Sequence, residues 1–446
     1  MTSTGVDDSS ARTLAAEDEV ATLVQELVRI DTSNFGNHEG PGEAEAAAYC
    51  QARLLEAGIT CERFHTSARH REGVVARIPG TNPDRPALLL HGHLDVVPAP
   101  ELSWEHPPFS GDIDEGILWG RGAVDMKDMD GMILAVVRNW ARTGIRPDRD
   151  LVVLFLPDEE AGGVHGSRWL VENRQDIFAG VTEAVGEVGG FSVTLQDDLR
   201  LYPIQTAEKG LAWLKLTVTG TAGHGSYLPV ENAITRLCEV AAKLGRHQFP
   251  VVLTPAAQEF VQRIEELTGI PLNLDDPANV IGRLGSIGRI IGATVRNTAN
   301  LTMLDAGYKA NVIPDTAQAY VDGRFLPGME EEFLASLDAI LGPDVQREFV
   351  HRDIAVETAF DGPTIDAMAA AIRSEDPSGI PVPYLMSGGT DAKAFSRLNI
   401  RCFGFSPLLL PADLDFFGMF HAVNERVPVS ALRFGVRVLD RFLRAA

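Results

Sequence analysis

Two short, fully apolar runs, each followed directly by imidazole or carboxylate side chains, set the strongest constraint on the fold of this chain. Residues 87–90 lead into the sequence HGHLD, and residues 151–156 lead into PDEE. Apolar runs of this length, without polar alternation, are typical of strands buried on both faces of a sheet. In such sheets, functional residues gather beyond the carboxyl ends of the strands, which is where both clusters lie. The sequence therefore predicts an α/β fold with a polar site at one end of its strands.

The pattern of the chain changes after about residue 206. Apolar and polar residues alternate over 214–219, which predicts a strand with one solvent-exposed face, and residues 231–246 have the spacing of an amphipathic helix. Beyond about residue 327, helices and short apolar strands alternate again. We therefore expect an inserted α+β domain, residues 207–327, within a discontinuous α/β domain, residues 1–206 and 328–446, that has a central, mostly parallel sheet.

Composition and charge exclude several classes of protein. The 446 residues carry 39 Lys and Arg against 62 Asp and Glu, a net charge of −23. A surface this acidic disfavours binding to nucleic acid or to an anionic membrane. No apolar stretch approaches the ~20 residues that span a bilayer, and the N-terminus lacks the basic and apolar regions of a secretory signal. The 4 cysteines show no CxxC spacing, which favours a reducing compartment, so we expect a cytoplasmic enzyme.

The first cluster, His93 and Asp95, supplies the nitrogen and oxygen ligands that zinc prefers. A metal-binding imidazole needs a partner that fixes its tautomer, and Asp95 could be that partner. The alternative is a loop histidine next to a capping aspartate. The second cluster places Asp158, Glu159 and Glu160 at the end of a buried strand, where adjacent carboxylates repel one another unless a cation neutralises them. This run favours a metal site with one spare carboxylate as a base.

Two further carboxylates have a similar placement. Asp125 lies in a glycine-flanked loop before a predicted helix, where it could be a metal ligand, the helix N-cap, or both. A dinucleotide-binding loop does not fit, because the third glycine position of that motif is Asp125 itself. Glu187 follows another short apolar strand.

Three other segments carry candidate residues, each with a simpler explanation. His224 lies between glycines in the inserted segment, where a solvated loop histidine is the alternative to a catalytic one. Residues 387–391, SGGTD, form a turn whose backbone N–H groups suit an anion, although an ordinary turn has the same features. His421 lies four residues before Glu425 and could equally be a histidine near a helix start. The chain lacks a GxSxG elbow, a phosphate-binding P-loop and an HExxH helix.

Eight motifs occur in one order along the chain: LLLHGHLDVVP, WGRGAVDMKD, PDEEAGG, GEVGGF, TAGHGS, NVIPDTAQAYVDGRF, SGGTDA and FHAVNE. Together they resemble the M20 metallopeptidase family, the group of aminoacylases, carboxypeptidases and succinyl-diaminopimelate desuccinylases. The resemblance runs from about residue 20 to the end of the chain. It implies a zinc-hydrolase catalytic domain with an inserted lid or dimerisation domain, and a homodimer through that domain as one alternative to a monomer.

The resemblance also implies two Zn²⁺ ions per chain, with Co²⁺ or Mn²⁺ as alternative metals. Asp125 matches the carboxylate that bridges both ions. His93 and Glu187 match the other ligands of the first ion, and Glu160 and His421 match those of the second. Each ion then has one imidazole and two carboxylates, counting the bridge.

By the same resemblance, the chain cleaves a linear amide in an N-acyl amino acid or a small peptide with a free carboxylate, using a metal-activated water. Glu159 matches the general base, Asp95 the partner that orients His93, and His224 the residue that stabilises the oxyanion. The positions that match those binding the substrate carboxylate are Arg324, Asn311, Gly389 and Thr390.

The second motif departs from the family pattern. Where relatives have glycines after its lysine, this chain has Asp128, Met129 and Asp130, which adds acidity near the site. Two other functions stay as alternatives, a non-catalytic binding protein on the same fold and a different two-metal hydrolase such as a phosphoesterase. The complete set of ligands and base argues against the first. The scarcity of basic residues around the motifs, Arg121 and Lys127 apart, argues against the second.

Overall fold

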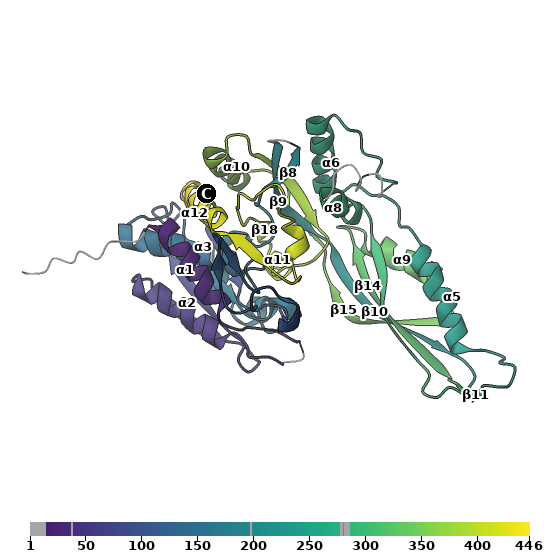
Figure 1. The fold of residues 1–446 in the computed structure, drawn as a ribbon. Coiled ribbons are helices and arrows are strands. Elements are labelled where there is room, and N and C mark those ends of the chain that lie inside the picture. Colours follow the sequence, from purple (N-terminus) through teal and green to yellow (C-terminus); the bar gives the residue numbers. More distant parts are fainter. Residues whose placement is uncertain (1–14, 37–38, 197–198, 277–279, 281–285) are drawn as a thin grey trace, which may run out of the picture. The chain divides into compact units, whose positions relative to one another are not determined.

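A computed structural model describes residues 15–36, 39–196, 199–276, 280 and 286–446 of the chain (Figure 1). The N-terminal segment, for which the sequence predicts no secretory signal, lies outside the described residues. The chain divides into two compact units. Unit 1 comprises Met1–Glu187, Pro363–Gly379 and Ser406–Ala446, and unit 2 comprises Val188–Gly362 and Ile380–Phe405.

Unit 1 contains a run of sheet with the strand order β1 (Cys61–His65), β2 (Glu72–Ile78), β6 (Leu151–Leu156), β3 (Ala87–His93) and β7 (Val181–Gly186). β3 pairs in parallel with β6 and β7, whereas β2 pairs antiparallel with β1 and β6. Every residue of β3 and β6 is buried, as the two apolar runs predict. The α/β class is confirmed, and the parallel pairs bring the carboxyl ends of β3, β6 and β7 to the same end of the sheet.

Helices α1 (Ala16–Val28), α3 (Lys127–Thr143) and α12 (Val429–Ala445) pack against one another in unit 1. α1 forms where apolar residues recur at three- and four-residue steps, and its Val20, Leu23 and Leu27 are buried. Unit 1 also contains α2 (Ala44–Glu56), α4 (Ser167–Asn173), α10 (Pro363–Glu375), and a small sheet of β4 (Ile113–Asp114), β5 (Ile117–Trp119) and β19 (Arg426–Pro428). Across all described residues, no helix is both long and apolar enough to span a membrane.

One sheet of unit 2 is centred on β9 (Leu199–Glu208). β9 pairs in parallel with β17 (Ile380–Met386) and antiparallel with β8 (Val193–Gln196), β16 (Val356–Glu357) and β18 (Arg401–Gly404). Helix α6 (Pro255–Thr268) packs against β17 and against α8 (Ser286–Thr294). The short helix α11 (Ala392–Ser396) precedes β18.

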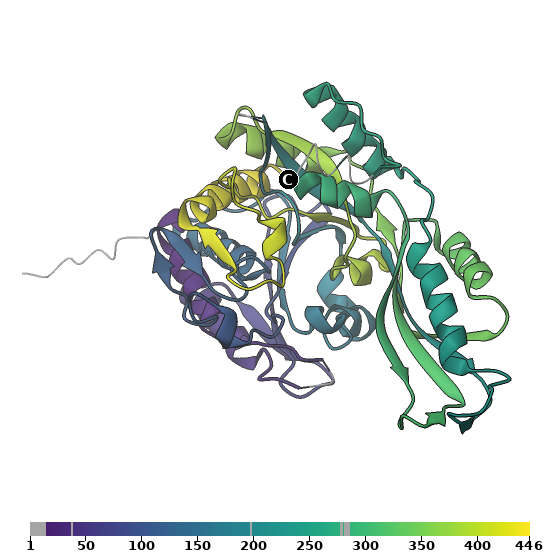
Figure 2. The same cartoon turned by 45° about the vertical axis from the view of Figure 1, so that its right-hand side comes forward.

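The second sheet of unit 2 is antiparallel, in the order β12 (Thr298–Ala306), β14 (Thr316–Phe325), β10 (Gly210–Thr219) and β15 (Val345–Asp353). Buried and more exposed residues alternate along β10 and β14, as the sequence predicts for β10. Helices α5 (Ala233–Arg246) and α9 (Glu330–Leu341) cover the buried face (Figure 2). A two-stranded ribbon of β11 (Gly223–His224) and β13 (Val312–Ile313) also belongs to this unit.

The predicted inserted domain, residues 207–327, falls within unit 2, but unit 2 is larger. It also takes in residues 188–206, 328–362 and 380–405. The reason is strand pairing between distant segments, because β15 pairs with β10 and β17 pairs with β9. The order of strands and helices along a chain does not show which strands pair. For this reason the predicted boundaries assign β15 and β17 to the discontinuous α/β domain, whereas the structure has them in unit 2.

Candidate metal centre

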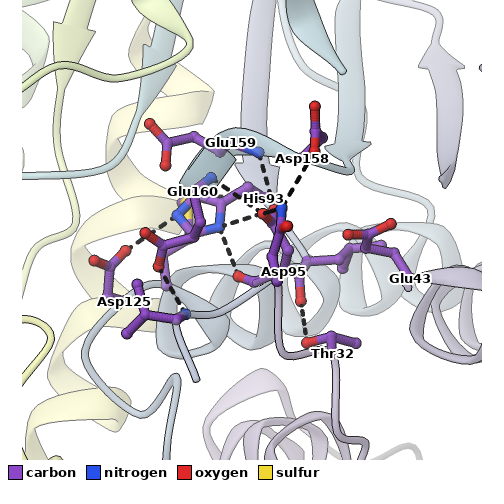
Figure 3. A network of polar contacts seen from close by, with 12 residues as sticks. Thr32, Glu43, His93, Asp95, Asp125, Asp158, Glu159 and Glu160 are labelled. Atoms are coloured by element: carbon purple, nitrogen blue, oxygen red, sulfur yellow. Dashed lines mark hydrogen bonds and ion pairs between the residues drawn. The ribbon is translucent and has the colours of Figure 1, made fainter. Parts of the chain in front are cut away.

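Four of the predicted site residues meet where β3, β6 and β7 end, and Figure 3 labels three of them, His93, Glu159 and Glu160. His93 is the last residue of β3, Glu159 and Glu160 follow β6 in the 3₁₀ turn Glu159–Ala161, and Glu187 follows β7. Ligand atoms of His93, Glu159 and Glu187 lie within 4.8 Å of one another, and so do those of His93, Asp125 and Glu160. Parallel pairing of the two apolar runs therefore brings the predicted side chains together.

His93 is 1% exposed, and its two ring nitrogens have different partners. Nδ1 lies 2.9 Å from the backbone carbonyl oxygen of Asp95, which can only accept, so Nδ1 donates there. Nε2 faces carboxylates instead, at 3.0 Å from Oδ1 of Asp125 and 3.5 Å from Oε2 of Glu187. This division of roles leaves Nε2 as the nitrogen that can bind a metal.

Asp125 stands between two imidazoles. Its Oδ1 lies 3.0 Å from Nε2 of His93, and its Oδ2 lies 3.2 Å from Nε2 of His421. The same nitrogen of His421 is 3.1 Å from Oε2 of Glu160. The two oxygens of one carboxylate thus face two separate donor sets, which is the arrangement of a ligand that two cations share.

The turn that presents Asp125 depends on glycine. Gly120 and Gly122 have φ angles of 149° and 88°, a region of backbone conformation that other residues rarely adopt. Helix α3 begins at Lys127 with Met126 as its N-cap, so Asp125 does not cap the helix and the capping interpretation is wrong. The peptide bond between Asp125 and Met126 is cis.

The electrostatics of this cluster favour a cation. Hydrogen bonds to Asp125 and Glu160 raise the pKa of His421 to about 10. Burial, followed by the charge of Asp125, raises the pKa of the Glu160 carboxyl. Imidazole nitrogens and carboxylate oxygens are the ligands that zinc takes in proteins, and each donor set offers both. The residues therefore fit a divalent cation on either side of Asp125.

The carboxylate of Asp95 has other partners than the sequence predicts. Its Oδ1 accepts the N–H of Glu159 at 3.0 Å, and its Oδ2 accepts the N–H of Glu160 at 3.1 Å. The distance from Oδ1 to Nδ1 of His93 is 3.6 Å, longer than the contact through the Asp95 backbone carbonyl. Asp95 therefore holds His93 mainly through its backbone, and its side chain fixes the turn that carries both glutamates.

Arg121 and Glu425 tie the loop of His421 to the turn of Asp125, a role that the sequence does not reveal. Oε1 of Glu425 is 3.2 Å from Nη1 of Arg121, and its Oε2 accepts the N–H of Gly122 at 2.5 Å. Nη2 of Arg121 donates to the carbonyl oxygen of His421 at 3.4 Å. Glu425 lies four residues after His421 in the sequence, but its partner Gly122 is 303 residues away, so no local pattern joins Glu425 to Gly122.

Two predicted residues of the inserted segment are neighbours in unit 2. His224 is exposed on β11, and its Nδ1 lies 2.8 Å from Oγ of Ser226. Asn311 immediately precedes β13, and its carbonyl oxygen accepts the N–H of Gly225 at 2.9 Å. The β11–β13 ribbon therefore places His224 and Asn311 side by side.

The other predicted substrate-binding residues already have partners within unit 2. On β14, Nε and Nη2 of Arg324 donate to the two carboxylate oxygens of Asp322 at 2.7 and 3.1 Å. The N–H and the hydroxyl of Thr390 both donate to Glu208, at 3.0 and 2.6 Å. Gly389 adjoins Lys393, whose Nζ lies 2.8 Å from the position that a Cβ on Gly389 would occupy. A substrate carboxylate that bound Arg324 or Thr390 would have to share these groups with Asp322 or Glu208, or displace those carboxylates.

Known proteins resemble this chain in both sequence and fold. A family model described as peptidase family M20/M25/M40 matches residues 89–445. The N-fatty-acyl-amino acid synthase/hydrolase PM20D1 of Bos taurus is 29% identical over 415 residues, which cover 85% of this chain and 79% of that protein. Aminoacylase-1 of Sus scrofa is 27% identical over 442 residues, which cover 95% of this chain and 94% of that protein. The M20 family metallo-carboxypeptidase Sso-CP2 from Sulfolobus solfataricus has a TM-score of 0.72 at 18% identity, covering 96% of this chain and 99% of that one.

Proposed function

The chain belongs to peptidase family M20/M25/M40 and is a hydrolase of amide bonds, and on this premise we propose that it cleaves an N-acyl amino acid or a small peptide with a free carboxylate. The names of two relatives, an N-fatty-acyl-amino acid synthase/hydrolase and an aminoacylase, support N-acyl amino acids as the first substrates to test. The observation that carries the proposal is the carboxylate of Asp125, whose two oxygens face two separate imidazole and carboxylate sets.

Two Zn²⁺ ions are the proposed cofactors, with Co²⁺ or Mn²⁺ as alternatives. His93 and Glu187 would hold one ion, Glu160 and His421 the other, and Asp125 both. Bound ions of this kind polarise the scissile carbonyl and make water a stronger nucleophile at neutral pH. The protein supplies their fixed positions, because the ligands come from strand ends and from turns held by Asp95, Arg121 and Glu425.

Glu159 is the proposed general base. It takes a proton from the attacking water and returns it to the nitrogen of the leaving amine, so no covalent acyl-enzyme is needed. Its ligand atom lies within 4.8 Å of those of His93 and Glu187, next to the reacting centre that these residues define. The hydrogen bond from its backbone N–H to Asp95, 3.0 Å long, keeps the turn that carries it in place.

Unit 2 carries the proposed substrate contacts. Arg324, Asn311, Gly389 and Thr390 would bind the free carboxylate, and His224 would donate a hydrogen bond to the oxyanion of the tetrahedral intermediate. A guanidinium suits a carboxylate because it presents two parallel N–H groups. In this structure Asp322 accepts two N–H groups of Arg324, so the substrate would compete with Asp322 for that side chain.

A substrate panel tests this proposal. Metal-depleted and metal-restored enzyme would be given N-acyl amino acids, dipeptides, the C-terminal amides of both, and a generic phosphoester. We expect metal-dependent release of free amine from the first two classes, no cleavage of the phosphoester, and about two metal ions per chain by elemental analysis. Full activity with only trace metal, or cleavage of the phosphoester alone, would overturn the proposal.

A further inference from the structure

Asn34 is a buried amide for which the proposed reaction has no use. It is 5% exposed, and its backbone N–H donates to the carbonyl oxygen of Val96 at 2.8 Å. Its Nδ2 donates to two carboxylates, Oδ2 of Asp95 at 2.9 Å and Oδ1 of Asp158 at 3.2 Å. Its Oδ1 accepts Nη2 of Arg71 at 2.7 Å. One side chain therefore joins the end of β3, the end of β6 and a guanidinium.

The two carboxylates that Asn34 joins hold the turn of Glu159 from both sides (Figure 3). Asp95 accepts the N–H groups of Glu159 and Glu160. Asp158 directly precedes Glu159, and its Oδ2 accepts the N–H of His165, at 2.8 Å, from the other end of the loop. Asp158 has a φ angle of 70°, a left-handed conformation that is uncommon for residues with a Cβ but that aspartate adopts more readily than most.

The charges around Asn34 explain why an amide occupies this position. Asp95 and Asp158 present acceptors on one side, and Arg71 presents donors on the other. Nε of Arg71 is also 3.5 Å from Oδ1 of Asp158, and Arg71 is hydrogen-bonded to the buried carboxylate of Glu43. An aspartate at position 34 would add a third acceptor beside two carboxylates, and an alanine would leave donors and acceptors without partners.

We propose that Asn34 is a positioning residue for Glu159, acting through Asp95 and Asp158. This inference rests on the proposed function, because it assumes that Glu159 is the general base. Asn34 donates to none of the five proposed metal ligands, but Oδ2 of Asp95, to which it donates, also accepts the N–H of the proposed ligand Glu160. Metal content is therefore measured beside kcat, because a role in proton transfer requires metal content to stay unchanged. A displacement of about 1 Å at a reacting group can cost roughly 100-fold in rate, which sets the size of the effect to look for.

The test is a double-mutant cycle between Asn34 and Glu159 in metal-saturated enzyme. We expect Asn34→Ala to lower kcat by about 10- to 100-fold, with KM within about threefold of wild type and metal content unchanged. In the Glu159→Gln background the same substitution should have no further effect on the residual rate, because no base is left to position. Asn173→Ala is the control, since Asn173 is the last residue of α4 and its amide donates to the carbonyl oxygen of Trp169 in the same helix.

The outcomes of the cycle distinguish failure of the role proposed for Asn34 from failure of the proposed function. If Asn34→Ala lowers the rate equally with and without Glu159, the residue acts independently of the base and the inference is wrong. If Asn34→Ala has wild-type kcat while Glu159→Gln is inactive, the inference fails and the proposed function stands. If Glu159→Gln itself has wild-type kcat, the proposed function fails first. Asn34→Ser, which keeps a small polar side chain and adds no charge beside Asp95 and Asp158, carries the test if the alanine variant does not fold. Failure of both variants to fold would make Asn34 a stability residue and overturn the proposal.

Discussion

In unit 1 the proposed metal ligands His93, Asp125 and Glu187 are buried, whereas in unit 2 the proposed substrate contacts His224 and Asn311 are exposed. A buried charge is costly unless the fold pairs it and completes its hydrogen bonds, so the geometry of the metal centre has to be set by the protein. An exposed side chain is solvated by water, so the fold does not have to supply its hydrogen-bond partners. The difference holds for these residues and has an exception in each unit, because His421 of unit 1 is exposed and Thr390 of unit 2 is buried and paired with Glu208. Burial therefore fixes the geometry of the buried proposed ligands, whereas His224 and Asn311 are free to adapt to a ligand.

The largest loss of metal binding and activity should come from substitution of Asp125, the residue that both donor sets share. Asp125→Ala removes one oxygen from each set, so we expect loss of both metals and of activity. Loss of a supporting residue alone typically costs 10- to 100-fold in metal affinity, so loss of this ligand should exceed about 100-fold. Elemental analysis and metal titration check it, with the exposed Asp114→Ala as control. A variant that retained one tightly bound metal would show that Asp125 is not the bridge.

Glu159→Gln should separate chemistry from metal binding. We expect metal content like that of wild type and a kcat lower by about 10²- to 10⁴-fold, the usual contribution of a general base. Steady-state kinetics on the best substrate of the panel measures this, and Glu172→Gln in the exposed part of α4 is the matched control. Near wild-type turnover would assign the proton transfer to another group.

His224→Ala tests whether an exposed residue of unit 2 contributes to the chemical step. If His224 donates to the oxyanion, kcat should fall by about 10²- to 10³-fold while metal content stays constant. The exposed His247 provides a control substitution in the same unit. Wild-type activity of the His224 variant would leave it as a solvated loop residue, hydrogen-bonded to Ser226.

Arg324→Ala should discriminate between substrates with and without a free carboxylate. A hydrogen bond between charged groups contributes about 1.5–3 kcal/mol, so kcat/KM for the acid should fall by about 10- to 150-fold more than for its C-terminal amide. Asp322→Asn is the companion variant, because it weakens the competing partner of Arg324 without removing the guanidinium. It should change kcat/KM for the acid far less than Arg324→Ala does. Equal losses for acid and amide would move the carboxylate site away from Arg324.

The smallest expected effect is on the stability of the fold and comes from substitution of the buried Lys209. Burial, with the nearby charges of Arg324 and Arg296, lowers the pKa of Lys209 from 10.5 to about 7. Between these two values the unfolded chain binds a proton at Lys209 that the folded protein does not, so this group makes the protein more stable as pH rises from about 7 toward 10.5. Lys209→Met should remove that slope and stabilise the protein by on the order of 1–3 kcal/mol at pH 7 or below.

Denaturant titrations of wild type and of Lys209→Met at several pH values would measure the difference between them. A constant difference from pH 6 to pH 10 would show that Lys209 keeps its ordinary pKa. Lys215, which is only partly buried on β10, provides the matched control as Lys215→Met.

The sequence by itself predicted which residues lie together at the ends of β3, β6 and β7. His93, Glu159, Glu160 and Glu187 follow short apolar runs that are typical of buried strands, and parallel strands end at the same end of a sheet. The hydrophobic pattern thus predicts both the strands and the cluster beyond them. Asp125 and His421 lie outside such runs: the glycine-flanked loop made Asp125 a candidate ligand, and the order of the family motifs assigned both residues to the metal site.

The tertiary structure alone decided the partner of each polar group. Asp95 contacts the turn of Glu159 more than the ring of His93, Arg324 is paired with Asp322, and Thr390 is paired with Glu208. Asn34 reaches a carboxylate 124 residues away in the sequence. Strand and helix periodicity reflects interactions between near neighbours, whereas a hydrogen bond in the core requires groups from distant segments to meet within about 3 Å. Only the packed fold brings those segments together, so the pattern of residues predicts where the site lies and the structure shows what holds it.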